Sequence, residues 1–182
     1  MDYKEIYGNL ITEALLGKFD VISHGTNCFC LQKAGIAKQM AEIFNTDELW
    51  LEDYVYKGKI NKLGMIDYQR IEISSGLIVD KEEPKEGTLT IVNAYTQFQP
   101  GKHLDYDALT LCLRKINFLF KGKHIGLPEI GCGIAGGIFD ITLLTKEQLK
   151  KIDFDLNNYI DVKTIIQREL KDMDVTIVKY KP

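Results

Sequence analysis

The sequence lacks the features that would mark a membrane or secreted protein. None of its apolar runs approaches the roughly 20 residues that a membrane-spanning helix needs. The first residues, MDYKEIYGNL, lack the basic and then apolar pattern of a secretory signal. A net charge of −3 gives no general attraction to nucleic acid. We therefore expect a cytoplasmic protein with no membrane contact, and nucleic acid is not an expected partner.

Potential metal ligands are also few, since the 182 residues include four cysteines and three histidines. His24, Cys28 and Cys30 lie within the stretch SHGTNCFC. Structural zinc sites usually combine a Cys-x₂₋₄-Cys pair with a second pair, and both are missing here. We predict no metal and no cofactor. A cysteine nucleophile at Cys28 with His24 as its base is a further alternative, but adjacency in a loop does not provide the geometry.

What the chain does contain is an alternation of strand and helix patterns, which is typical of a layered α/β domain. We treat residues 1–182 as one domain. Strands are expected at 3–8, 19–25, 62–73, 76–80, 88–97, 124–128 and 174–180, and helices at 35–44, 46–56, 105–120, 145–152 and 161–172. In such sheets ligands gather at the carboxyl ends of the strands. The loops that follow Ser23 and Pro128 are therefore expected to converge on one cleft.

Two glycine-bearing loops are suited to binding an anion. EIGCGIAGG (129–137) can expose successive backbone amides, and AGIA (34–37) begins a predicted helix, whose free amides favour phosphate. Neither loop is a P-loop or a dinucleotide-binding fingerprint. Two such loops facing each other would suit a diphosphate. The alternative for each loop is a structural tight turn.

The order of GNLIT, DVISHGTNCFC…AGIA, KLG, VNAYTQ and LPEIGCGIAGG resembles the macrodomain family, which binds ADP-ribose. Within that family the sequence looks nearest the branch of ADP-ribose-1''-phosphate phosphatases and phage-type macrodomains. The resemblance implies a three-layer α/β/α sandwich with a mixed central sheet. It also implies that ADP-ribose or ADP-ribose-1''-phosphate is the ligand.

The resemblance assigns roles to individual residues. Asn9 would hold the adenine amino group, and Asn27 would contact a ribose. Asn9 as a cap of the turn and Asn27 as an Asx turn are the structural alternatives. The residues implied for the two phosphate loops are Gly35, Ile36 and Ala37, followed by Gly131, Cys132, Gly133, Ile134, Ala135 and Gly136.

His24, at the end of its predicted strand, is the candidate for acid–base chemistry, with Asn27 beside it as a second catalytic residue. The alternative is a histidine that packs and hydrogen-bonds within the protein. In GKHLDYD, the acidic residues Asp105 and Asp107 and the neighbouring His103 can also reach the cleft. Asp105 is better explained as the cap of the following helix.

Two departures from the family pattern bear on activity. Ala135 stands where many macrodomains carry an aromatic residue over the distal ribose, a role that Phe139 can fill instead. One hydrolase branch uses a lysine and an aspartate at positions that match Gln97 and Ala135. The absence of that pair argues against its mechanism.

Three functions remain open at this point. The first is an enzyme, a phosphatase acting on ADP-ribose-1''-phosphate. The second is a module that binds ADP-ribose or another NAD metabolite without catalysis, and the third is removal of ADP-ribose from a macromolecule. Residues 141–160 form a predicted insertion that either covers the cleft, contacts another chain, or is a surface segment without a function.

Overall fold

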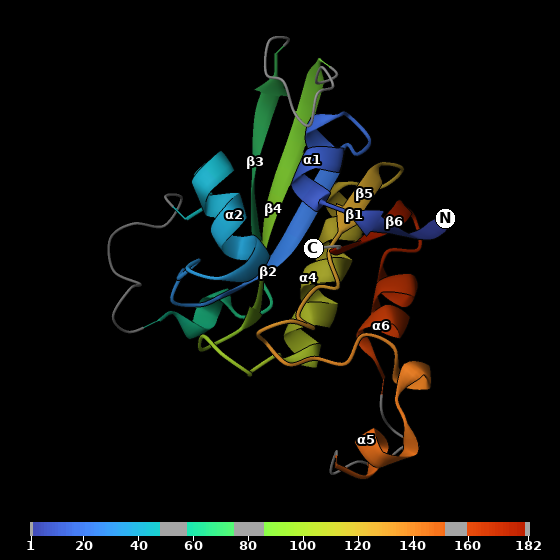
Figure 1. Ribbon diagram of the computed structural model, residues 1–182. Helices are drawn as coiled ribbons and strands as arrows, with labels where there is room; N and C mark the ends of the chain where they lie inside the picture. Colours follow the sequence, from blue (N-terminus) through green and yellow to red (C-terminus); the bar gives the residue numbers. More distant parts are fainter. Residues whose placement is uncertain (1, 48–57, 75–85, 152–159, 181–182) are drawn as a thin grey trace.

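The computed structural model describes residues 2–47, 58–74, 86–151 and 160–180, and its centre is one six-stranded sheet (Figure 1). The strand order is β1-β6-β5-β2-β4-β3. Among the described strands, only β3 and β4 pair antiparallel, so the sheet is mixed. The strands are β1 (Tyr3–Gly8), β2 (Val21–Asn27), β3 (Ile66–Ile73), β4 (Gly87–Gln97), β5 (His124–Leu127) and β6 (Asp174–Tyr180).

Short polar signals define where most helices begin. Asn9, Asp105 and Asp161 each accept hydrogen bonds from backbone amides in the first turn of the helix that follows. Asp105 therefore acts as the predicted helix cap. The helices are α1 (Leu10–Leu15), α2 (Gly35–Phe44), α4 (Tyr106–Leu119), α5 (Lys146–Lys151) and α6 (Val162–Glu169), with 3-10 turns η2 (Ile60–Lys62) and η3 (Ile141–Leu143).

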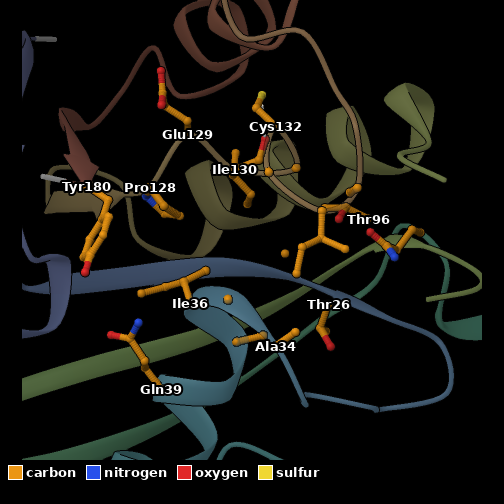
Figure 2. A pocket seen from close by; sticks show the side chains of 18 of the residues that line it. Thr26, Ala34, Ile36, Gln39, Thr96, Pro128, Glu129, Ile130, Cys132 and Tyr180 are labelled. Atoms are coloured by element: carbon orange, nitrogen blue, oxygen red, sulfur yellow. Dashed lines mark hydrogen bonds between the residues drawn. The ribbon is translucent and has the colours of Figure 1, made fainter. Parts of the chain in front are cut away.

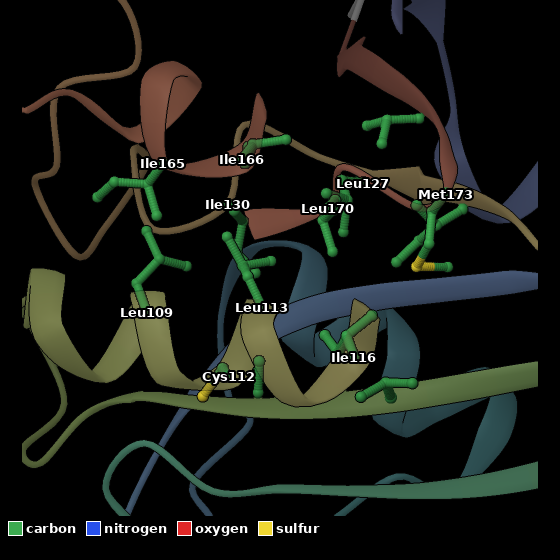
Figure 3. Packing of buried hydrophobic residues seen from close by; sticks show 14 of the residues in the cluster. Leu109, Cys112, Leu113, Ile116, Leu127, Ile130, Ile165, Ile166, Leu170 and Met173 are labelled. Carbon is green, nitrogen blue, oxygen red and sulfur yellow. The ribbon is translucent and has the colours of Figure 1, made fainter. Parts of the chain in front are cut away.

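The helices cover the two faces of the sheet and create two apolar cores. On one face, α4 and α6 pack on β2, β4, β5 and β6, as Figure 3 shows for Leu109, Leu113 and Ile165. On the other face, α1 and α2 pack through Ile11 and Met40 against the apolar residues of β2 and β4. The inner strands are buried on both faces, which explains their continuous apolar runs. The three-layer α/β/α sandwich predicted from the sequence is confirmed.

Most predicted elements are present, with shifted ends. The second strand runs from Val21 to Asn27 instead of 19–25, because its backbone pairs with β4 as far as Asn27. A helix, α5, forms where one was predicted near 145–152, while the role of 141–160 as an insertion stays a prediction. The predicted strand at 76–80 and nearly all of the predicted helix at 46–56 lie outside the described residues. Among the described helices, none is long and apolar enough to cross a membrane.

Candidate functional site

The candidate site is a pocket of about 670 Å³ at the carboxyl ends of β2, β4, β5 and β6. Figure 2 shows α2, with Ala34 and Ile36, on one side and the loop after β5, with Ile130 and Cys132, on the other. The loops after β2 and β5 thus converge on one cleft, as the sequence predicts. A pocket of this size accommodates a small-molecule ligand such as a nucleotide.

The first loop presents the amino end of α2 to the pocket. Gly35 has φ +59°, a value that favours glycine and turns the chain sharply into the helix. The preceding Ala34 provides no side-chain cap, so the first amides of α2 lack the partner that a serine or aspartate would supply. These amides, together with the helix dipole, are suited to an anion. Gly35, Ile36 and Ala37 all line the pocket.

The second loop is a compact turn that two backbone hydrogen bonds close. Gly137 N–H donates to Gly131 O at 2.8 Å, and Gly136 N–H donates to Gly133 O at 3.1 Å. Within the described residues, the N–H groups of Gly133, Ile134 and Ala135 have no hydrogen-bond partner. Unpaired amides in a tight turn form an anion-binding concavity. Gly131, Cys132, Gly133, Ile134 and Ala135 line the pocket.

Gly136 lies just outside that lining. A β-carbon there would meet the Lys102 side chain at 3.4 Å, so this glycine faces the segment that follows β4. The same segment anchors the loop through Leu104 N–H, which donates to Ala135 O at 3.2 Å. Gly136, predicted to contact the ligand, is therefore not among the residues that line the pocket, and it packs against this segment.

Asn27 lines the pocket, but much of its amide stabilises the loop that carries it. Its Oδ1 accepts from Phe29 N at 3.1 Å and from Leu31 N at 3.2 Å, and its Nδ2 donates to Leu31 O at 2.8 Å. This geometry is that of the Asx turn, the structural alternative to a ligand-binding role for Asn27. One N–H of the amide is left for a ligand, because an amide nitrogen carries two donors.

Asn9 also lines the pocket, and it is the N-cap of α1. Its Oδ1 accepts from Ile11 N at 2.9 Å and from Thr12 N at 3.2 Å. The oxygen that was expected to receive the adenine amino group therefore already accepts two hydrogen bonds. The capping alternative describes the observed geometry.

His24 does not line the pocket, contrary to its predicted catalytic position. The strand continues two residues beyond the predicted end, and its alternation turns the ring toward the face that α2 covers. There His24 Nε2 lies 2.7 Å from Asn93 Oδ1, and the side chain is fully buried. Asn93 also donates to Thr46 O and to Asp67 Oδ1, both at 3.0 Å. The packed and hydrogen-bonded alternative is the one observed.

This buried network reaches the ligand loop through Gln32. Its Nε2 lies 3.4 Å from Asn93 Oδ1 and 3.3 Å from Thr46 O, and its Oε1 accepts from Thr46 Oγ1 at 2.6 Å. Gln32 is three residues before Gly35. The network consequently fixes the chain that enters α2.

Burial of His24 predicts a pH-dependent stability. Desolvation lowers the pKa of His24 to about 4, from about 6.5 in an unfolded chain. Between these values the unfolded state binds the extra proton, so acidification favours unfolding. We expect the free energy of unfolding to fall by about 2 kcal/mol between pH 7 and pH 5.

Urea unfolding across that range measures this loss. The variant His24→Asn, which has no titrating ring, should show a flatter profile. An equally steep profile in the variant would contradict the assignment.

Phe139 is a second correction, since it does not reach the ligand pocket. Its side chain is buried in the core under α6, with the Lys179 ammonium 5.4 Å from the ring centre. Lys163 N–H donates to Phe139 O at 2.9 Å, and Val162 N–H donates to Ile138 O at 3.0 Å. These bonds fix the segment against the start of α6, so Phe139 cannot cover the distal ribose.

Gln97 and Ala135 both line the pocket, and neither provides a nucleophile. Gln97 Nε2 donates to Gln99 O at 2.7 Å and to Gly101 O at 3.3 Å, which shapes the turn after β4. The methyl group of Ala135 has no acid–base chemistry. The two positions that match a lysine and an aspartate in one hydrolase branch thus carry an amide and a methyl group here.

The cysteines are poorly placed for chemistry. Burial raises the pKa of the Cys28 thiol to about 11 and that of Cys132 to about 12, so both stay protonated near neutral pH. Across the part of the chain that the structure describes, no group of three His, Cys, Asp or Glu side chains could hold a metal ion.

Sequence reasoning missed several pocket residues, notably Gln39 and Tyr180. Gln39 is one turn beyond Gly35 on the same face of α2, a spacing that could have indicated it. Tyr180 ends β6 beside β1, and its position depends on the sheet order, which the sequence does not state. Thr26 and Thr96 add buried hydroxyl groups to the lining.

Solved structures define the class of this fold. The macrodomain of Thermus aquaticus DarG superposes with a TM-score of 0.54 at 18% identity, covering 99% of this chain and 98% of that one. The Thermosipho africanus DarTG structure in complex with ADP-ribose gives a TM-score of 0.61 at 12% identity, covering all of this chain and 42% of that one. The chain has the macrodomain fold.

A sequence relative places the chain more narrowly. It is 32% identical over 149 residues to the "Uncharacterized 17.5 kDa protein in tk-vs intergenic region" of Enterobacteria phage T4, a match that covers 78% of this chain and 85% of the phage protein. The chain belongs to the same family as this phage T4 protein. No model of a known protein family matches the sequence.

Proposed function

We propose that this protein binds ADP-ribose, with the diphosphate held between the two glycine-bearing loops. The observation that carries the proposal is the pair of free-amide loops facing each other across one pocket, at the start of α2 and at Gly133–Ala135. Backbone amides in a turn and at a helix start favour a bound diphosphate. The similarity in fold to a structure that contains ADP-ribose supports the same ligand.

Removal of the terminal phosphate from ADP-ribose-1''-phosphate is the second candidate. The observation that favours it is that Asn27, with one amide N–H left over, lines the same pocket as the second loop, so that both can supply donors to stabilise charge on a reacting phosphate. His24 takes no part, because its side chain is fully buried and does not line the pocket. Catalysis would depend on electrostatic placement, and its turnover would be slow.

Titration calorimetry with ADP-ribose and a phosphate-release assay with ADP-ribose-1''-phosphate separate these functions. We expect ADP-ribose to bind with a micromolar dissociation constant. Phosphate release that Asn27→Ala abolishes would establish the enzyme, whereas binding without release would establish a binding module. If calorimetry detects no binding of ADP-ribose and no phosphate is released, the proposal fails.

A further inference from the structure

The pocket has a second end, away from Thr26 and Thr96, that the two loops do not explain. Figure 2 shows Gln39, Pro128 and Tyr180 at this end and Thr26 and Thr96 at the other. If a diphosphate lies between the loops, the Tyr180 end suits the base of the nucleotide, because the aromatic ring and the carboxamide there match a planar base with hydrogen-bonding edges. The residue that recognises this base has to present hydrogen-bonding groups there.

Asn9 is poorly suited to that task in this chain. Both hydrogen bonds to its Oδ1 come from the first turn of α1, at 2.9 and 3.2 Å. Turning the amide toward a base would remove the cap of that helix, which is worth about 1 kcal/mol in comparable caps. A different side chain is better placed to recognise the base.

Gln39 meets the requirement. It is partly buried, lines the pocket, and follows Ile36 by three residues, so both share the helix face that borders the ligand. Across the described part of the chain, no hydrogen bond or ion pair involves the Gln39 side chain. Figure 2 shows its carboxamide directed toward the Tyr180 end of the pocket.

We propose that the Gln39 carboxamide is the group that determines specificity for the base of the bound nucleotide, with the Tyr180 ring beside it. This inference rests on the proposed binding of ADP-ribose. Adenine carries an exocyclic amino donor next to a ring-nitrogen acceptor. A carboxamide matches that pair, because its oxygen accepts from the amino group while its nitrogen donates to the ring.

The test compares ADP-ribose with its 1,N6-ethenoadenine counterpart, in which an added ring removes the amino donor and blocks N1. Calorimetry gives the ratio of the two dissociation constants for the wild type and for Gln39→Leu. We expect the wild type to prefer ADP-ribose by roughly tenfold and the variant to bind both ligands about equally. The ratio is informative because a general loss of folding or loop order would weaken both ligands together.

Glu42→Gln is the matched control, since Glu42 lies on the same helix and its carboxylate pairs with Lys38 at the surface. This variant should keep the wild-type ratio. An unchanged ratio in Gln39→Leu overturns the inference, as does a ratio that collapses in Asn9→Ser instead. Failure of the wild type to bind ADP-ribose would reject the proposed function itself, a result distinct from an unchanged ratio.

Discussion

Replacing Asn93 by leucine is expected to lower the free energy of unfolding by about 4 kcal/mol, because it removes hydrogen bonds from several buried polar groups. Asn93 lies beside His24 and Asp67 in the register of three adjacent strands, and its amide bonds to both. It also binds Thr46 O. A leucine of similar volume satisfies none of these groups.

Equilibrium unfolding in urea measures the loss, and Asn117→Leu is the matched control. Asn117 lies on α4 and exchanges two hydrogen bonds with Asp172, whose carboxylate is partly exposed. Its replacement should cost about 1 kcal/mol, since water can satisfy much of what is lost. Equal losses for the two variants would show that the buried network contributes no more than this partly exposed pair.

Gly137→Ala is expected to weaken ADP-ribose binding by at least about a hundredfold, by displacing the second phosphate loop. A β-carbon at Gly137 would lie 2.8 Å from Gly131 O and against the Leu104 side chain. The hydrogen bond from Gly137 N–H to Gly131 O closes this loop. Its loss would move the free amides away from the position that a phosphate requires.

Titration calorimetry with ADP-ribose gives the affinity, and thermal unfolding reports any loss of stability. Gly87→Ala provides the control, because a β-carbon at the start of β4 meets no atom within 4 Å. That variant should bind as the wild type does. Wild-type affinity in Gly137→Ala would mean that the second loop does not hold the diphosphate.

The sequence predicted the parts of this fold that depend on local chemistry. Asp105 begins its helix through a side-chain bond to Ala108 N, a contact within three residues that is readable from composition and spacing. Convergence of the two glycine loops was predictable too, because parallel strands place their carboxyl ends on one edge.

The predictions for single site residues were wrong where the end of a strand or a contact between distant segments decides which way a side chain points. His24 faces the core because β2 continues to Asn27, and successive side chains of a strand point to opposite faces. Phe139 is buried because the start of α6 binds its backbone. Gln39 and Tyr180 line the same end of the pocket although they lie on α2 and β6, and no local signal in the sequence specifies that arrangement.

The parallel pairing of β1 with β6 has a practical consequence for attaching the protein to a surface or a label. Gly8 pairs with Tyr180 at the pocket, whereas Tyr3 pairs with Val175 at the opposite edge of the sheet. A linker attached after Tyr180 would start beside the pocket and obstruct entry of the ligand. One joined before Tyr3 would leave that entrance open, so immobilised assays should use the amino-terminal side.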